Sequence, residues 1–375
     1  MKRTLFLLPL LGACTPSISV RVLEPAAVSV PPEVKTLAIV DRSAAQGAGE
    51  QVMSAIEGVL TGESILGDRE GAKRAIDQFV MVVEEGPRFE VVRPSLTKDQ
   101  LDSSVWDDEL GWGKVRKICE MSHADALVSL EAFDSDSNMI INPSTLADGT
   151  VQFNAQRDSY VLAAWRVYYP KGKILLDDQR DRKYSQSWTG DGATREAAIG
   201  AIPGANDTIS GLGTDAGDAY ARRISPSFRW VGRSYYKKGN DTLKRVGREF
   251  EAQDYDGAGA DLRKLVSDSS LDMKTQGRAE FDMALYYETM GDLDSALVWA
   301  KKSAVDLGNG KSRGYVQVLS QRIADAKLLE EQMKIAPDAP PPVRAGATPA
   351  TPQGGRAQNG TTGTSTSRPR PTSAP

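Results

Sequence analysis

The chain is poor in the residues that build metal centres and activated nucleophiles. It has two cysteines and one histidine among 375 residues, which excludes a zinc site of the usual cysteine and histidine type. A net charge of −4 offers no general attraction for nucleic acid. No apolar stretch reaches the roughly 18 residues typical of a membrane-spanning helix. We therefore expect no catalytic residue, no metal, no cofactor and no nucleic-acid partner.

The N-terminus carries a targeting signal. Lys2 and Arg3 precede a short apolar run, Thr4–Leu11, which fits the hydrophobic region of a secretory signal peptide. The run ends in Leu11-Gly-Ala-Cys14, a pattern that resembles the lipobox of bacterial lipoproteins. This resemblance implies removal of residues 1–13 and attachment of lipid to Cys14. The alternative is an ordinary signal peptide followed by a chance cysteine.

Lipidation of Cys14 would tie the mature chain to a membrane without spanning it, because more than one acyl chain gives stable attachment. Thr15 stands where an aspartate would favour retention in the inner membrane, so analogy with other lipoproteins favours the outer membrane. We expect a lipid-anchored protein of the cell envelope. Neither the leaflet that it faces nor its oligomeric state can be predicted from the sequence.

Short apolar runs alternate with amphipathic segments up to about residue 235, and residues 14–34 are expected to form a tether and a first strand. The pattern over 35–235 predicts an α+β or α/β domain, a mixed sheet with packed helices. Expected strands are 19–23, 37–40, 88–93, 126–133, 160–169 and 173–188, and expected helices are 49–60, 68–85, 114–122 and 215–223. We interpret residues 134–157 as a long polar excursion.

Three features of this domain are candidates for chemistry. Asp41 and Arg42 follow a central strand at its carboxyl end, where α/β sheets place ligands, although a buried or rim ion pair is the simpler interpretation. Cys119 falls on the inner face of a helix, as a buried residue would, and His123 lies one turn later as a conceivable partner. The glycines of 211–217 indicate a flexible loop rather than a nucleotide site.

One polar segment resembles half of a calcium loop. Asp134-Ser-Asp-Ser-Asn138 has the first ligands, but Met139 and Thr145 stand where a glycine and a bidentate glutamate belong. We therefore expect a solvated loop.

Helical periodicity replaces the strands over residues 236–335. The hexapeptide Gln253–Ala258 recurs as Gly291–Ala296, 38 residues later, and each copy lies between two expected helices. This arrangement resembles the tetratricopeptide repeat, and a pair of generic helical hairpins is the alternative. Because two repeats rarely stand alone, we expect the helices to pack also on the preceding domain or on a partner. Residues 336–375 are rich in Pro, Thr, Gly and Ser and are expected to be a disordered tail.

Several short segments resemble a family of uncharacterised lipoproteins from Bacteroidetes-type bacteria. The segments are Leu23–Ala26, Lys35–Ser43, Asp125–Glu131, Trp165–Tyr168 and Ala221–Pro226. The family has no assigned activity, so the resemblance implies no catalytic residues. More remotely, the order of elements is similar to that of periplasmic domains of the curli secretion lipoprotein and of the Tol-system translocation protein.

These observations favour a non-enzymatic envelope lipoprotein that acts as a protein–protein adaptor or assembly factor. A peptide or protein partner would bind along the tetratricopeptide-like helices, with Tyr287, Glu288 and Lys302 as candidate contacts. One alternative is an accessory lipoprotein that binds a small ligand or peptidoglycan through residues 134–157. A hydrolase with a site near Asp41 is less favoured.

Overall fold

The structure is a computed structural model of the chain and describes residues 16–43, 65–96, 101, 109–308 and 310–334. The expected helix over 49–60 lies outside these residues. In chain order, the elements are β1 (Ser17–Glu24), β2 (Thr36–Asp41), α2 (Ile65–Glu85), β3 (Glu90–Val92), α3 (Trp112–Ser122), β4 (Ala126–Thr145), β5 (Val151–Tyr169), β6 (Ile174–Gly192), α4 (Arg195–Gly200), α5 (Ala205–Ile224), β7 (Ser227–Ser234), α6 (Asp241–Glu251), α7 (Tyr255–Val266), α8 (Met273–Thr289), α9 (Leu293–Asp306) and α10 (Gly310–Met333).

Five strands form a mixed sheet in the order β3-β2-β4-β5-β6. β2 lies parallel to β3 and to β4, whereas β4, β5 and β6 form an antiparallel meander. The apolar run from Leu37 to Val40 is buried throughout, as a central parallel strand requires. The expected mixed sheet with packed helices, followed by a helical region, is confirmed.

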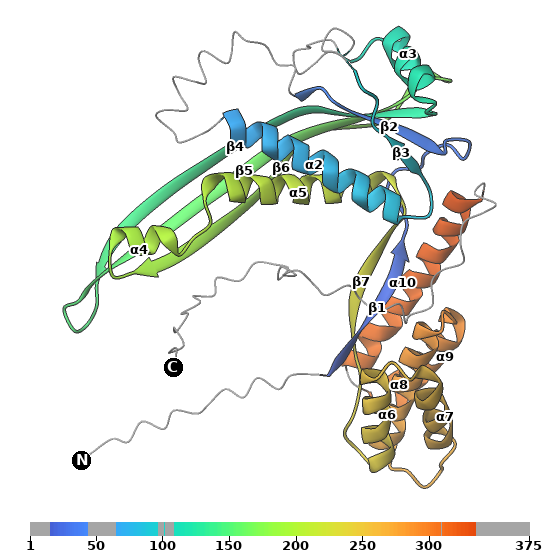
Figure 1. Cartoon of the computed structure of the whole chain (residues 1–375). Helices are drawn as coiled ribbons and strands as arrows, with labels where there is room; N and C mark the ends of the chain where they lie inside the picture. The colour runs from blue at the N-terminus through green and yellow to red at the C-terminus, as the bar shows by residue number, and fades with distance from the viewer. Residues whose placement is uncertain (1–15, 44–64, 97–100, 102–108, 309, 335–375) are drawn as a thin grey trace, which may run out of the picture.

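The helices α2 and α5 lie side by side across one face of the sheet, and α3 covers the opposite face at one end (Figure 1). Strand β5 alternates as the sequence predicted, and its residues Val161, Ala163, Trp165, Val167 and Tyr169 are buried in the core under α2 and α5. The Trp165 ring is stacked on Phe79 of α2 and on Tyr220 of α5, with centroids 5.6 Å and 4.7 Å away.

The loop expected over 211–217 is wrong, because α5 begins at Ala205 and runs through these glycines. A Cβ atom on Gly213 would lie 2.3 Å from the carbonyl oxygen of Gly71, and one on Gly217 would lie 2.0 Å from that of Ala75. The glycines therefore let the backbones of α5 and α2 approach closely.

The polar excursion expected over 134–157 is also wrong. β4 continues to Thr145 and β5 begins at Val151, in a register that runs from Asp134 opposite Leu162 to Thr145 opposite Val151. The face of β4 and β5 toward α5 carries hydroxyl groups instead of apolar side chains. The sequence therefore lacks the apolar–polar alternation that predicts a strand. Ser137 and Ser159 are buried and lie 2.8 Å apart, and Ser159 lies 2.9 Å from Thr208.

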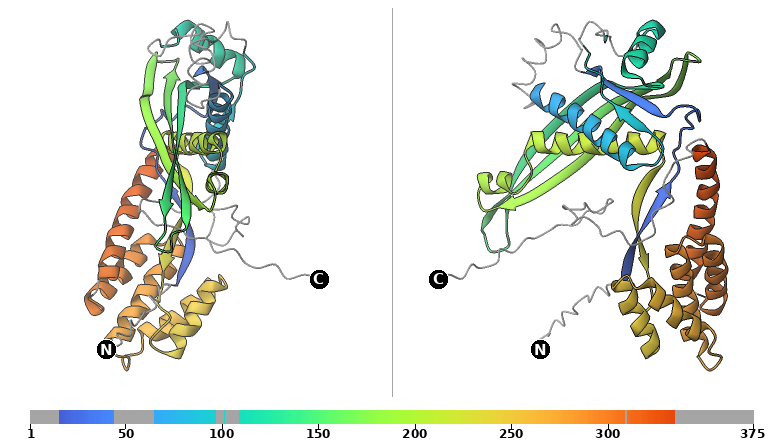
Figure 2. Two further views of the ribbon diagram at one scale, coloured as in Figure 1. Left: turned by 90° about the vertical axis from the view of Figure 1, so that its left-hand side faces the viewer. Right: turned by 45° about the vertical axis from the view of Figure 1, so that its right-hand side comes forward.

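A separate two-stranded ribbon joins the sheet domain to the C-terminal helices (Figure 2). β1 pairs antiparallel with β7, from Ser17 opposite Ser234 to Glu24 opposite Ser227. The sequence predicted β1 but not β7. Ile18, Val20 and Val22 turn one face of the ribbon into the apolar core of the helices. We call this pair the β1–β7 ribbon.

The helices α6 to α10, which we call the helical unit, form two hairpins and a long final helix. The repeated hexapeptides make the same turn twice. Gln253 and Gly291 both have left-handed backbones, with φ of 60° and 82°, and the following Asp254 and Asp292 cap α7 and α9. The second copy uses glycine at this position, which suits the left-handed conformation better than glutamine.

The expected packing of the helices on the preceding domain is confirmed at the end of α10. The Gln332 side chain makes two hydrogen bonds with the backbone of Ala26, of 3.0 Å and 2.9 Å. The Arg88 guanidinium donates to the Gln332 carbonyl at 3.0 Å and to carbonyls of the segment that leads into β2. This clasp and the β1–β7 ribbon connect the helical unit to the sheet domain at two places.

Candidate functional site

The helical unit carries an extended segment of its own chain on one side. After β7, residues 235–238, which we call the strap, run across α6 and α8 before Gly239 turns the chain into α6. The contacts of the strap come from α6, α8 and α10. The face formed by these three helices, which we call the inner face, is thus occupied within the chain.

The two tyrosines of the strap are held differently. Tyr235 is buried, its ring meets Phe250 edge-on at 5.5 Å, and its hydroxyl donates to Glu251 at 2.6 Å. Tyr236 is half-buried and meets Phe281 edge-on at 5.1 Å, with the Lys311 ammonium 4.1 Å from its ring centre. Both tyrosines thus anchor the strap to the helices through aromatic and cation–π contacts.

The strap backbone is also recognised. The Tyr236 N–H donates to Asp282 Oδ1 at 2.8 Å, and the Lys238 carbonyl accepts from Arg278 at 2.7 Å. Asp282 is fully buried, and burial raises its pKa well above the ordinary value. Its second oxygen, Oδ2, has no hydrogen-bond partner among the described residues.

Glu288, a candidate partner contact, is buried and accepts hydrogen bonds from several residues of its own chain. It is 2 % exposed, and both its carboxylate oxygens accept from Arg233 of β7 at 3.0 Å. Tyr315 and Arg322 of α10 also donate to it. Burial works to raise the pKa of Glu288, but these donors outweigh it and hold the pKa below its ordinary value. The hydrogen bonds of the Glu288 side chain are therefore made within the molecule.

The other two candidate contacts lie nearer the surface. Tyr287 is half-buried and packs against Tyr286, with ring centroids 5.1 Å apart. Lys302, on α9, makes an ion pair with Glu280 at 2.9 Å, and its side chain is 48 % exposed.

Lys302 belongs to an exposed stripe on α9 that the sequence analysis did not single out. Val298, Lys301, Lys302 and Val305 follow at helical spacing, and the two valines are 65 % and 80 % exposed. We call these four residues the α9 stripe. It is an apolar strip with two lysines on the side of the hairpin away from the strap.

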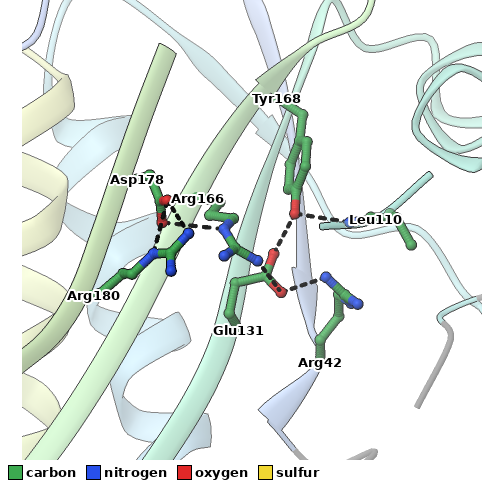
Figure 3. A network of polar contacts seen from close by, with 7 residues as sticks. All are labelled: Arg42, Leu110, Glu131, Arg166, Tyr168, Asp178 and Arg180. Atoms are coloured by element: carbon green, nitrogen blue, oxygen red, sulfur yellow. Dashed lines mark hydrogen bonds and ion pairs between the residues drawn. The ribbon is translucent and has the colours of Figure 1, made fainter. Parts of the chain in front are cut away.

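A buried charge network lies at the carboxyl end of β2 (Figure 3). Arg42 does not pair with Asp41 but with Glu131 of β4, and both are almost fully buried. Asp41 instead accepts from the Ser43 backbone and hydroxyl, at 3.0 Å and 2.6 Å. Glu131 also accepts from the Tyr168 hydroxyl at 2.8 Å.

The network continues across the meander to β6. Arg166 of β5 lies 3.8 Å from Glu131 and 3.1 Å from Asp178, which also accepts from Arg180 at 2.9 Å. The Tyr168 hydroxyl accepts from the Leu110 backbone at 3.1 Å. Burial raises the pKa of Glu131, and Arg42, Tyr168 and Arg166 oppose that rise. Glu131 and Arg42 are 5 % and 1 % exposed at the side chain, so a shift in register that separated them would leave a buried charge unpaired, and the pair favours the observed register of the sheet.

An open cleft of about 610 Å³ lies beside the end of α3, lined also by the loop between β5 and β6 and by Glu33. Cys119 and His123 both contribute to it. Burial raises the pKa of the Cys119 thiol to about 12, with Asp125 and Glu120 adding to the rise. The thiol is therefore protonated at neutral pH, unlike the thiolate that a nucleophile needs. Among the described contacts, none joins the thiol to the His123 ring.

The residues described by the structure offer no shared metal site. No group of three or more His, Cys, Asp or Glu side chains in this part of the chain is placed to hold an ion. Asp134–Asn138, the half calcium loop, lies in β4, where Asp134, Asp136 and Asn138 share one face but follow one another about 6.6 Å apart along an extended strand, so they do not curve around one ion.

The proposed lipidation site, Cys14, lies outside the described residues, as does the whole of the expected tail, 336–375. No helix within the described ranges is both long and apolar enough to cross a bilayer.

Sequence reasoning missed the partners that organise these sites. Glu131, Arg166 and Tyr168 were assigned to strands without a role, although charged residues inside otherwise buried strands were the available signal. The strap gave no signal, because an extended Tyr-Tyr-Lys-Lys segment has neither helical nor strand periodicity.

The comparisons with known proteins identify two regions. The family described as Domain of unknown function (DUF8603) matches residues 34–236, from just before β2 to the strap. A second family, Domain of unknown function (DUF6340), matches residues 244–322, from α6 into α10. No curated protein matches the chain. Since the first match spans more than half of the 375 residues, the chain belongs to the family described as Domain of unknown function (DUF8603).

Proposed function

We propose that this protein is a non-enzymatic adaptor of the cell envelope, anchored by lipid at Cys14, whose helical unit binds a protein partner. The observation that carries the proposal is the α9 stripe. Two valines that are 65 % and 80 % exposed lie on one helix face beside Lys301 and Lys302. Exposed apolar side chains grouped in this way mark interaction sites.

The chemistry of the α9 stripe suits an amphipathic segment with carboxylates. The valines would be buried by apolar groups of the partner, and the lysines would pair with its acids, which gives specificity more than affinity. Tyr287 and Glu288 are not proposed as primary contacts, since the first is half-buried and the second is committed to Arg233, Tyr315 and Arg322.

The resemblance to tetratricopeptide repeats supports the same role. The two hairpins, α6–α7 and α8–α9, share a left-handed turn residue followed by a capping aspartate. Repeats of this type stack into surfaces that recognise peptides. The anchor is supported by the sequence Leu11-Gly-Ala-Cys14. Because Cys14 precedes the first residue of β1, Ser17, by three positions, a lipid there would hold the β1–β7 ribbon near the membrane.

Deleting the helices is a poor test, because the deletion would expose Ile18, Val20 and Val22 of the ribbon. We would instead compare cells with the native chain and with Val298→Asp/Val305→Asp, after chemical crosslinking and mass spectrometry of the isolated protein. The control is Ile140→Asp/Val151→Asp, which alters two apolar residues on the sheet that are 46 % and 48 % exposed.

The adaptor proposal expects one envelope protein to be lost with the α9 variant and retained with the control. Neighbours that are the same in all three samples would contradict it. The anchor is tested separately by the mass of the N-terminal peptide and by release of a Cys14→Ser chain from the membrane fraction.

The cleft beside α3 favours a second candidate function, binding of a small polar ligand. Its volume of about 610 Å³ falls in the range of ligand pockets. Arg116 and Lys171 line it, while Glu33 is engaged by Tyr169 at 2.7 Å. Screening envelope metabolites by thermal shift, with Lys171→Glu as the control, would test this alternative.

A further inference from the structure

We propose that the inner face of the helical unit is a peptide-binding groove, which the strap fills in cis and which fits an extended partner segment with two adjacent aromatic residues followed by a basic one. This inference rests on the proposed role of the helical unit in partner binding. It adds a second surface to that role and names the chemistry of the segment that the surface recognises.

The groove contacts the strap at four points. Phe250 and Glu251 of α6 receive the ring and the hydroxyl of the first tyrosine, Tyr235. Phe281 and Lys311 receive the second ring, that of Tyr236. Asp282 accepts a backbone N–H, and Arg278 donates to a backbone carbonyl. Aromatic anchors combined with backbone hydrogen bonds are how proteins bind extended peptides.

The surface of α6 leaves space for the strap through a glycine. Gly247 of α6 lies under it, and a Cβ atom there would come within 2.9 Å of the Lys237 Cβ and 3.1 Å of the Tyr235 ring. A larger residue on α6 would therefore push the strap away. Lys237 and Lys238 themselves are exposed, and Lys237 pairs with Glu251 at 3.3 Å.

Asp282 makes the strap displaceable. The carboxyl is buried beneath the strap with one oxygen lacking a hydrogen-bond partner among the described residues, which is unfavourable. Lifting the strap would return this group to water and offset part of the lost contacts. The charged groups that face Asp282 are Arg278 of α8 and Lys311 of α10. A partner segment that supplied its own N–H to Asp282 would restore the same contacts.

The strap competes with such a partner at high local concentration. A segment linked within the same chain has an effective concentration on the order of 1 mM, so a free peptide with the same contacts is strongly disfavoured. Loosening the strap should remove this competition. The effect on the binding of a free peptide measures the groove directly.

The test uses a fluorescent synthetic peptide with the sequence of residues 234–240, titrated into the full chain and into its Tyr236→Ser variant. We expect the variant to bind at least tenfold more tightly than the native chain. A peptide with alanine at both tyrosines should not bind. Equal binding by both chains, no binding by either, or full binding of the alanine peptide would overturn the proposal.

Hydrogen exchange of the native chain gives a second measurement, which does not depend on the stability of the variant. We expect the Tyr236 amide to exchange by local opening, faster than the amides of α8. Exchange of Tyr236 only on global unfolding would overturn the proposal. The adaptor role would survive that result if the α9 variant still lost its partner, so the two failures are distinguishable.

Discussion

Removing the charge of Glu288 should destabilise the contact between the β1–β7 ribbon and the helical unit. The Glu288 side chain is fully buried, and its partners Arg233 and Arg322 are 16 % and 21 % exposed. Breaking a buried ion pair costs about 3–5 kcal/mol, and we expect the lower end because both arginines can gain water. Glu288→Gln should therefore lower the free energy of unfolding by about 3 kcal/mol, a roughly hundredfold rise in the unfolded fraction.

Thermal unfolding followed by circular dichroism measures this loss. If the chain unfolds as one unit, the midpoint should fall by about 5 °C. Glu330→Gln, an exposed glutamate on α10, is the matched control and should change the stability by less than about 0.5 kcal/mol. A loss below about 1 kcal/mol for Glu288→Gln would refute the reasoning, since it would mean that the charge does not hold the contact.

The pH dependence has a definite sign. The folded pKa of Glu288 lies below its ordinary value of 4.5, so folding favours the charged form. Its contribution is fully present above pH 4.5 and is lost as the pH falls through the folded pKa. The difference between the native chain and Glu288→Gln should be largest near neutrality and should shrink in acid. A difference that grew in acid would contradict the assignment.

Three further predictions concern other parts of the fold. Gly217→Ala should cost about 2–3 kcal/mol in urea unfolding, because its Cβ would clash with the Ala75 carbonyl, whereas Gly314→Ala, in open space on α10, should be neutral or stabilising. Gln253→Gly should raise the free energy of unfolding by about 1 kcal/mol by relieving the left-handed backbone, and no gain would mean that the two turns are not equivalent. In a Cys14→Ser chain at pH 8, Cys119 should alkylate about a thousandfold more slowly when folded than in urea, since its pKa is raised from 9.0 to about 12, and equal rates would show an exposed thiol.

Much of the fold follows from periodicity where one face of an element is apolar. The residues from Val161 to Tyr169 alternate and lie in the core under α2 and α5, and the 68–85 stripe packs as α2. Hydrophobic periodicity does not identify strands in which small polar side chains replace the apolar ones. Ser137, Ser159 and Thr208 satisfy one another inside the protein, and so two long strands had the composition of a loop.

The glycines of α5 show a related limit. Glycine lowers helix propensity, so Gly213 and Gly217 indicated a loop when considered alone. Their reason for being in a helix is the close approach of α2, which is a tertiary contact. Helix propensity depends on the local sequence, so it does not indicate that the backbone of another helix packs against these glycines.

The candidate sites were less predictable than the fold. A buried or rim ion pair was expected at Asp41 and Arg42, and Arg42 does form a buried one, but its partner, Glu131, is 89 residues away and could not be named from the sequence. Glu288 looked like a surface residue of α8, and only the pairing of β1 with β7 brings Arg233 to it. Each of these contacts depends on a long-range pairing that a single sequence does not encode in its local pattern.

The most direct test of the adaptor role is site-specific photocrosslinking in intact cells. A photoreactive amino acid is placed at position 298 in the α9 stripe, where Val298 is 65 % exposed, and, as a control, at position 151 on the sheet, where Val151 is 48 % exposed. The account predicts a discrete adduct with one envelope protein from position 298, weakened by Lys302→Glu and absent from position 151. No adduct from position 298, or the same adducts from both positions, would contradict it.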